Sequence, residues 1–406
     1  MESIKIEQVL IIIFAGAIVA LIARRLRVPY TVGLVTAGVC VAFLHVPLDV
    51  GFSKDLLFRL LLPPLIFEAA LQINWGELRR DLSLIAVYAT LGVILAAAVT
   101  AAFMNFIVGW TWDASILFGV LIAATDPVSV IAAFKDAKVT GRLRLLVEAE
   151  SLFNDSTAAV AFAVALAFSA GASFTFAYSI WLMLASVAGG IISGLLIGGL
   201  ALLVIGNTKD KLVELAMTTV AAFGSFWLAE HFQLSGILAT TAAGLLIGNM
   251  TAFGSFTEKG EESVGHFWDF AAFVVNSVIF IVLGFNLAYQ DFGIMLWPVI
   301  VAIIAVLIGR AVAVYPCSAL FRWSRLRVEA NRQHVLFWGG LRGALALALA
   351  LGIPETFPLR QQILTVTFGV VAFSVFVQGL TMPVLLRRLG HIPGIDETTP
   401  EPAETS

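Results

Sequence analysis

The chain has 406 residues, of which 60% are hydrophobic and only 13% charged, with a formal net charge of −3. A soluble domain carries roughly 45–50% apolar and about 25% charged residues, so this composition and a mean hydropathy of +0.98 exclude an ordinary soluble protein. No basic stripe suggests nucleic acid. We therefore predict an all-α polytopic membrane protein whose surroundings are the lipid bilayer.

Thirteen apolar segments are separated by charges and turn residues, and each is a candidate transmembrane helix. The N-terminus, "MESIKIEQVL", lacks a basic region and a small-residue cleavage site, so we expect a retained first span rather than a removable signal peptide. In chain order the segments are 6–24, 29–45, 52–73, 82–108, 114–134, 145–171, 174–205, 211–231, 234–252, 262–288, 293–321, 332–352 and 359–386.

Basic residues are distributed unevenly between alternate loops. One set of loops holds 18 Lys and Arg residues, whereas the opposite loops hold Lys54 and Arg360, with Lys5 on the N-terminus. Because Lys and Arg accumulate on the cytoplasmic side, we predict a multi-pass protein of the cell (inner) membrane with its N-terminus outside and its C-terminus in the cytoplasm. Residues 389–406 are polar and rich in Pro, Thr and Glu, which predicts a short disordered cytoplasmic tail.

An odd number of spans allows an inverted repeat within the membrane domain, residues 1–388. If 174–205 is a linker helix, then 6–171 and 211–386 run in opposite directions through the bilayer, a plan found in many transporters. Close helix packing is predicted for the linker by three glycines spaced four apart: Gly190, Gly194 and Gly198.

Two of the predicted spans contain helix-breaking residues. The fifth holds Pro127 in "ATDPVSV", and the twelfth holds "WGGLRGALA", with glycines at 339, 340 and 343. These two spans are symmetry-related in a six-plus-one-plus-six arrangement. We therefore predict a crossed pair of discontinuous helices near the midplane, where such folds bind their substrate.

Charged residues deep in apolar segments are the candidate functional residues, because each costs ~2.5–3.5 kcal/mol at a helix centre. Asp155 and Ser151 lie four residues apart in "VEAESLFNDSTAAV", so one helix face offers a carboxylate and a hydroxyl, which are hard ligands for a small cation. Glu150 and Asn154 share a neighbouring face. The alternative for Asp155 is a packing carboxylate paired with an arginine, although no basic residue lies one turn away.

The other buried charges favour structural roles. Asp126 can satisfy free N–H groups and the helix dipole at the first break, while Thr125 can lend its hydroxyl or a freed carbonyl to an ion. Arg342 lies in the matching break, where unpaired carbonyls favour a cation. Arg310 needs a permanent anion, and Glu150 is the best candidate from the spacing.

Glu68 follows the prolines of "LPPLIF" and is either functional or a snorkelling acid at a helix end. No HExxH motif or His/Cys pairing indicates a catalytic metal, and we expect no cofactor and no enzymatic activity. An intramembrane aspartyl protease would use Asp126 and Asp155, but its Gly-x-Gly-Asp pattern is missing and Pro127 follows the first acid.

Six motifs, in this order, resemble the monovalent cation:proton antiporters of the NhaP/NHE type. They are "LPPLIFEAAL", "TDPVSV", "ESLFND", "GRAVAVY", "WGGLRGA" and "VQGLTMPVL". The resemblance covers nearly the whole chain and departs from the family at Ala149, where a Gly is usual. It implies an NhaA-like 6+1+6 fold with a dimerisation domain and a moving core domain, a homodimer formed through the first and linker helices, and elevator-type exchange.

The same resemblance implies roles for individual residues. Asp155 would bind cation and proton in competition, and Ser151, Thr125 and Glu68 would complete the shell of a bound Na⁺. Asn154 would bridge the unwound segment. The structural charges of the core would be Asp126, Glu150, Arg310 and Arg342.

The implied function is secondary active exchange of a monovalent cation for H⁺ in pH homeostasis. We expect Na⁺, with Li⁺ possible, and a K⁺/H⁺ antiporter on the same site is the alternative. An Asn–Asp pair in place of two aspartates resembles the electroneutral, one-for-one branch. A passive cation channel is the alternative of a different class, but an inverted repeat with two broken helices favours alternating access.

Overall fold

The computed structural model describes residues 6–26, 28–44, 56–171, 176–250 and 256–390. These residues form helices and connecting turns without a β-strand, which confirms the predicted all-α class. Seven of the described helices are long and apolar enough to cross a membrane. The count of thirteen spans stays a prediction, and the predicted tail from residue 391 onward lies outside the described residues, as do Lys5 and Lys54.

The helices follow the predicted apolar segments in order. The first half contains α1 (Ile6–Leu26), α2 (Tyr30–Phe43), α4 (Leu62–Gln72), α5 (Trp75–Val87), α6 (Val93–Phe103), α7 (Trp112–Leu121), α8 (Val128–Asp136) and α9 (Arg142–Ser169). The remainder contains α10 (Phe176–Ile205), α11 (Lys211–His231), α12 (Gly236–Met250), α13 (Glu258–Ala288), α14 (Phe292–Leu320), α15 (Ala330–Trp338), α16 (Ala344–Leu351), α17 (Arg360–Phe373) and α18 (Leu380–Arg388). Short π-helical stretches extend or join some of these helices: η1 (Leu57–Leu61), η2 (Tyr88–Gly92), η3 (Met104–Val108) and η5 (Ser374–Gly379).

Several helices begin earlier than the apolar pattern predicts. The fourth predicted segment starts at residue 82, whereas α5 starts at Trp75, where the Asn74 side chain accepts a hydrogen bond from the backbone N–H of Glu77 at 3.1 Å. The tenth starts at 262, whereas α13 starts at Glu258 behind Thr257, which accepts from the N–H of Gly260 at 3.1 Å. These caps extend the helices beyond their apolar parts, which hydropathy alone does not register.

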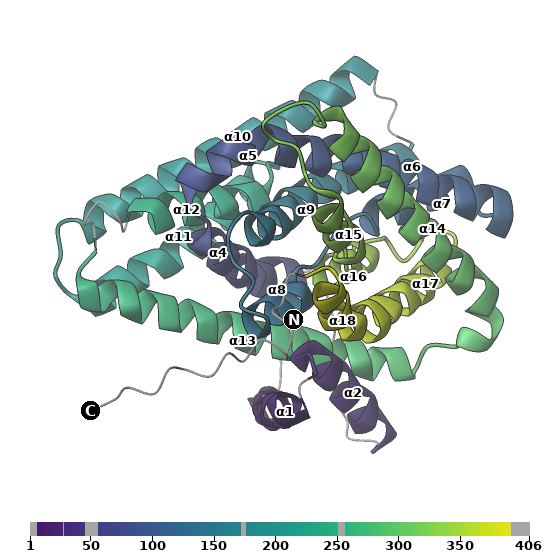
Figure 1. The fold of residues 1–406 in the computed structure, drawn as a ribbon, viewed down its shortest axis with the longest axis horizontal. Helices are drawn as coiled ribbons and strands as arrows, with labels where there is room; N and C mark the ends of the chain where they lie inside the picture. The colour runs from purple at the N-terminus through teal and green to yellow at the C-terminus, as the bar shows by residue number, and fades with distance from the viewer. Residues whose placement is uncertain (1–5, 27, 45–55, 172–175, 251–255, 391–406) are drawn as a thin grey trace, which may run out of the picture.

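The two predicted interruptions are present. One lies between α7 and α8, and the other between α15 and α16. The interruptions touch, because the backbone N–H of Asp126 donates to the Leu341 carbonyl at 2.8 Å. Figure 1 places α8, α9, α15 and α16 at the centre of the molecule, surrounded by the other helices.

The glycine stripe of α10 packs against α12, as its spacing predicts. A Cβ at Gly194 would overlap the Ala239 carbonyl, and one at Gly190 would lie 2.6 Å from the Ser235 carbonyl oxygen. Only hydrogen side chains allow two helix backbones to approach this closely. The helix α10 is thereby held against the second half of the chain.

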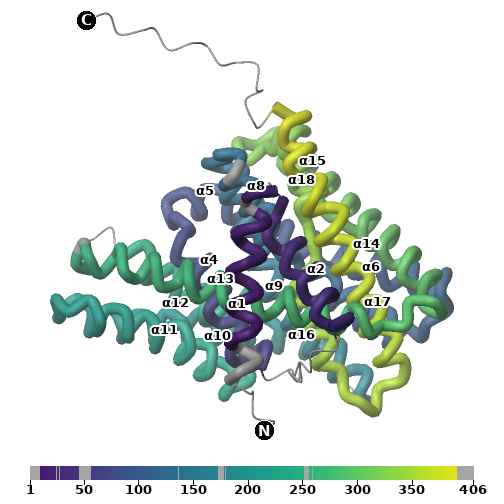
Figure 2. Tube along the Cα trace, turned by 90° about the horizontal axis from the view of Figure 1, so that it is seen from below, coloured from purple at the N-terminus to yellow at the C-terminus, as the bar shows by residue number. Residues whose placement is uncertain are grey.

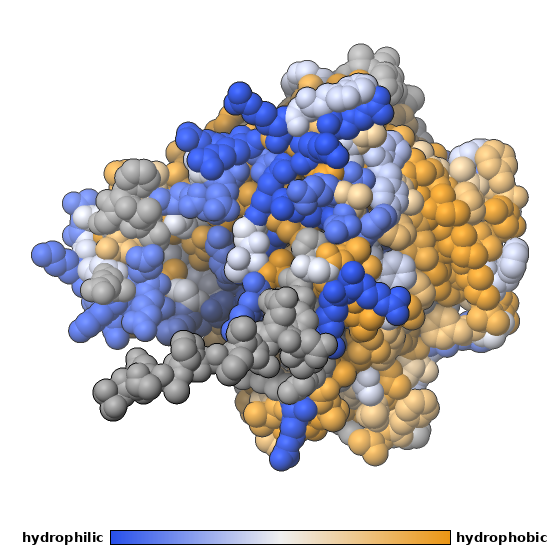
Figure 3. Space-filling view, in the orientation of Figure 1, coloured by the Kyte–Doolittle hydropathy of each residue, from blue (hydrophilic) through white to orange (hydrophobic). Residues whose placement is uncertain are grey.

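Polar residues gather on one face. Figure 2 shows α5, α8, α15 and α18 toward the same end of the molecule. The space-filling view in Figure 3 shows hydrophilic side chains over the centre and left of the molecule, whereas hydrophobic side chains cover its right side. This division is expected where a water-exposed end adjoins a lipid-facing surface.

Candidate ion-binding site

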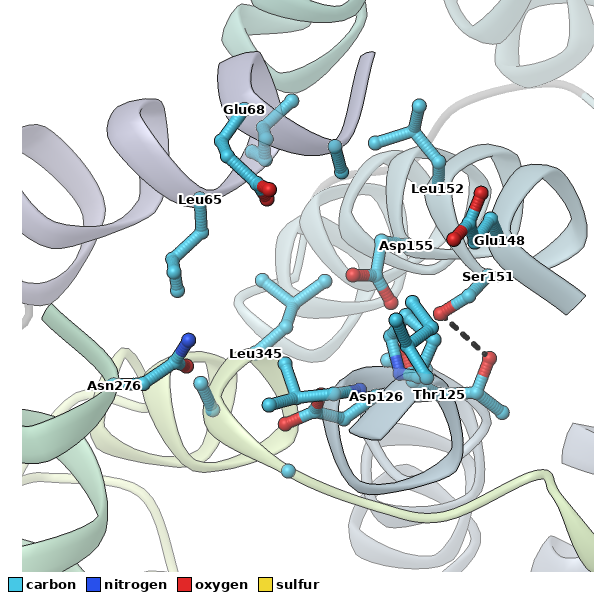
Figure 4. Close-up of a pocket in the computed structure, with 18 of the residues that line it drawn as sticks. Leu65, Glu68, Thr125, Asp126, Glu148, Ser151, Leu152, Asp155, Asn276 and Leu345 are labelled. Carbon is cyan, nitrogen blue, oxygen red and sulfur yellow. Dashed lines mark hydrogen bonds between the residues drawn. The ribbon is translucent and has the colours of Figure 1, made fainter. Parts of the chain in front are cut away.

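A small cavity of about 120 Å³ lies beside the two interruptions. It has room for a small cation with several waters. Its polar lining comes from α4, the first interruption, α8, α9 and α13 (Figure 4), namely Glu68, Gln72, Thr125, Asp126, Lys135, Glu148, Ser151, Asp155 and Asn276. The cavity therefore brings together the predicted ligands Asp155, Ser151, Thr125 and Glu68.

Asp155 and Ser151 lie one turn apart on α9 and face the unwound Thr125. The Ser151 hydroxyl donates to the Thr125 carbonyl at 2.5 Å, and the two hydroxyl oxygens are 3.3 Å apart. The Asp155 carboxylate lines the same cavity, and its Oδ1 is buried without a hydrogen-bond partner among the described residues. A buried unpaired carboxylate oxygen is costly unless a proton or a cation reaches it.

Asn154 connects α9 to the first interruption. Its amide nitrogen lies 3.3 Å from both the Thr125 hydroxyl and the Glu150 carboxylate, so it can donate to each. Glu150 in turn forms a bidentate ion pair with Arg310 of α14, with N–O distances of 2.7 and 2.8 Å. Glu150, Asn154 and Arg310 are all at least 94% buried, so each charge or donor depends on these partners.

Arginine side chains satisfy the freed carbonyls at both helix breaks. Arg342 donates to the carbonyls of Ala123 and Ala124, just beyond the end of α7, at 2.9 and 3.1 Å. Arg310 donates to the carbonyl of Leu336 near the end of α15 at 2.8 Å. The negative ends of two half-helices thus each face a guanidinium.

Asp126 lies at the opposite, N-terminal ends of the half-helices. Its carboxylate accepts from the backbone N–H of Val128 at 2.9 Å, so it caps α8, and it also lies against the start of α16. A Cβ at Gly343 would overlap this carboxylate. The absence of a side chain at Gly343 therefore leaves room for the Asp126 carboxylate at the start of α16.

Glu68 occupies a different side of the cavity. In Figure 4 it projects from α4, across from Ser151 and Thr125. Its carboxylate accepts a hydrogen bond from Gln72 on the same helix. Glu68 also lines a second, larger cavity.

Comparison with known proteins agrees with this architecture. Residues 9–388 match the model of the transmembrane sodium/hydrogen exchanger family. The chain belongs to this family. This exchanger is 35% identical over 401 residues to the low-affinity Na⁺/H⁺ antiporter NhaS1 of Synechocystis, with 96% of this chain and 76% of the relative covered. It is 31% identical over 399 residues to the Na⁺/H⁺ antiporter NhaH of Halobacillus dabanensis, with 95% and 98% covered.

The exchanger also shares the antiporter fold of a solved structure. Its superposition on the sodium proton antiporter MjNhaP1 of Methanocaldococcus jannaschii at pH 8 has a TM-score of 0.75 at 19% identity, covering 95% of this chain and 98% of the other. A second MjNhaP1 structure gives a TM-score of 0.77 at 20% identity, with 98% and 99% covered. At this identity the likeness establishes the fold.

Some polar residues of the exchanger's cavities were not predicted from the sequence. Asn276 of α13 lines both cavities, and Asp269 lines the larger one. A polar amide in the apolar stretch "FVVNSVIF" is the signal that could have identified Asn276. Among the described residues no group of three or more His, Cys, Asp or Glu side chains converges, so an ion here would bind to hydroxyls and carbonyls as well as carboxylates.

Proposed function

We propose that this protein is a secondary active transporter that exchanges Na⁺ for H⁺, with Asp155 binding either ion. The observation that carries the proposal is the buried, unpartnered Oδ1 of Asp155 beside the Thr125 carbonyl and the Ser151 hydroxyl. These are the hard oxygen ligands that a small monovalent cation prefers. Glu68 is the remaining member of the proposed ligand set, and the similarity to Na⁺/H⁺ antiporters supports Na⁺ and H⁺ as substrates.

Exchange follows from competition for one carboxylate. A proton or a Na⁺ neutralises Asp155, whereas an empty site would carry an uncompensated charge through an apolar region at high cost. The loaded forms therefore cross and the empty form does not. Glu150 is paired with Arg310, Asp126 caps a helix end and Asn154 is neutral, so the proposed stoichiometry is one Na⁺ for one H⁺.

The proposed movement is of the elevator type, in a fold of thirteen spans with inverted repeats. The two touching interruptions support this arrangement, because they form a compact unit that can carry the site as one body. A homodimer formed through α1 and α10 completes the proposal. Both helices carry exposed apolar side chains, including Phe14, Leu21, Ile192 and Leu196.

We place the protein in the inner membrane of the cell, with its C-terminus in the cytoplasm. It is supported by the described basic residues of α5, α9, α15 and α18, which belong to the Lys- and Arg-rich loops. Figure 2 places α5, α15 and α18 toward one end.

The decisive experiment is proton movement in proteoliposomes loaded with acid and exposed to a Na⁺ gradient. The wild type should release protons on addition of Na⁺, and Asp155→Asn should abolish this release, because a neutral amide cannot exchange a proton for a cation. Asp113→Asn is the matched control, since Asp113 is exposed and far from the cavity lining. Sustained exchange by a folded Asp155→Asn protein would refute the proposal.

The same proteoliposomes show which cation the protein prefers. Li⁺ and K⁺ replace Na⁺ in parallel assays, and a response to K⁺ exceeding that to Na⁺ would establish K⁺/H⁺ exchange instead. Flux that saturates and is stimulated by substrate on the opposite side identifies a carrier, whereas a passive channel lacks this stimulation.

A further inference from the structure

A larger cavity of about 730 Å³ adjoins the ion-binding cavity. The two share Glu68 and Asn276, with Val128, Ile131 and Lys135, so they meet along these residues. The rim of the larger cavity includes exposed Lys135 and Arg387. An ion that reaches Asp155 through this cavity must pass Glu68 and Asn276.

Two carboxylates from different helices converge in this passage. The Gln72 amide nitrogen donates to Glu68 of α4 and lies 3.4 Å from Asp269 Oδ1 of α13. Because the amide nitrogen of Gln72 reaches both acids, their oxygens converge on a place that favours a hydrogen-bond donor or a cation. Asp269 is exposed and Glu68 is half-buried, so the pair is accessible from water.

Asn276 is an independent sign of a ligand in the same passage. It follows Asp269 by two turns on α13, and Ala272 and Phe273 between them also line the larger cavity. It is 5% exposed. The carbonyl oxygen of its amide is buried without a partner among the described residues. Buried amide oxygens are normally satisfied, so this one has a free coordination position.

We propose that Glu68, Asp269 and Asn276 form a loading site, which binds a partly hydrated monovalent cation before it reaches Asp155. The inference rests on the proposed cation exchange and adds a second binding position to it. Exposure falls from Asp269 through Glu68 to Asn276, so protein oxygens can replace the ion's waters in steps. Figure 4 shows Glu68 and Asn276 on the side of the small cavity opposite Ser151 and Thr125.

The first test measures the Na⁺ dependence of exchange with Na⁺ supplied from the face of the larger cavity. Asp269→Asn and Asn276→Leu should raise the KM severalfold and change the maximal rate by less than twofold, because they weaken loading and neither residue is among the proposed ligands at Asp155. Asn276→Asp, which keeps an oxygen, should retain a KM near that of the wild type. Glu261→Gln is the control, since exposed Glu261 lies on α13 and lines neither cavity.

An unchanged KM in both Asp269→Asn and Asn276→Leu would overturn the loading site. A fall in maximal rate with an unchanged KM would also overturn it, because that result indicates a role in transport rather than in loading.

The second test separates the loading site from the transport site. Purified Asp155→Asn protein should still bind ²²Na⁺ weakly and saturably, and adding Asp269→Asn should remove that binding. Absence of saturable binding in the single variant, or its persistence in the double variant, would overturn the inference. Exchange activity surviving in Asp155→Asn would instead refute the proposed function, so the two failures are distinguishable.

Discussion

Neighbouring residues of α9 have separate roles, because successive side chains on a helix point in different directions. Glu150 and Asn154 point toward the core, where they meet Arg310 and Thr125. Asp155 faces the cavity. The sequence "ESLFND" thus combines a structural brace and an ion ligand on adjacent helix faces.

The Glu150–Arg310 pair should be important for stability. Glu150→Gln leaves a buried guanidinium without its counter-ion, and we expect a loss of about 3–5 kcal/mol. Thermal unfolding in detergent measures this loss. The control is Glu329→Gln, whose pairing with Arg332 is exposed and 3.5 Å long, so its effect should be below ~1 kcal/mol. Equal, small effects of both changes would show that the buried pair contributes little.

Asn154→Asp should lower both stability and turnover. The change removes the donor that reaches Thr125 and Glu150 and places a second carboxylate next to Glu150. Na⁺ binding at Asp155 should persist, measured as the part of the ²²Na⁺ binding of this variant that an added Asp155→Asn change removes. Asn331→Asp at an exposed position is the control. Wild-type turnover together with wild-type stability in Asn154→Asp would contradict the bridging role.

At the scale of elements, the two interrupted helices depend on each other. Asp126 caps α8 and lies against the start of α16, Arg342 satisfies the carbonyls after α7, and a backbone hydrogen bond joins the interruptions. Neither interruption could be buried alone, because its free N–H and carbonyl groups would lack partners in an apolar surrounding.

Gly343→Ala should therefore destabilise both interrupted helices. The added methyl overlaps the Asp126 carboxylate, and we expect a destabilisation of about 1–3 kcal/mol with loss of exchange. Gly199→Ala is the matched control, because a Cβ at Gly199 of α10 meets no described atom within 4 Å. Thermal unfolding and proteoliposome exchange measure both variants. Normal exchange by Gly343→Ala would show that Asp126 need not stay in place.

At the scale of the whole molecule, the charge that crosses the membrane in each cycle defines the mechanism. If one Na⁺ exchanges for one H⁺, the rate of exchange should not respond to an imposed membrane potential. Proteoliposomes with positive and negative internal potentials, at fixed Na⁺ and pH gradients, provide the measurement. A strong voltage dependence would exclude one-for-one exchange.

The orientation of the molecule can be measured with single cysteines in a variant that lacks Cys40 and Cys317. Ser324→Cys and Glu355→Cys place thiols at exposed positions on opposite predicted sides. An impermeant maleimide should label position 355 in intact cells and position 324 only in inverted membrane vesicles. The reverse pattern would contradict the predicted topology.

The sequence by itself determined the all-helical membrane class, the order of the helices and the positions of both interruptions. These features depend on hydropathy and on local breakers such as Pro127, which act within a few residues. The family motifs also identified Asp155 and its neighbours as the candidate site.

Tertiary structure decided which partners those residues meet. The Arg310–Glu150 pair joins residues 160 positions apart, and Asp126 lies against Gly343, more than 200 residues away. Asn276 and Asp269 became candidates because the fold places α13 beside α4 and the cavities. Local patterns do not encode such contacts, since pairing between distant helices is fixed by the packing of the complete chain.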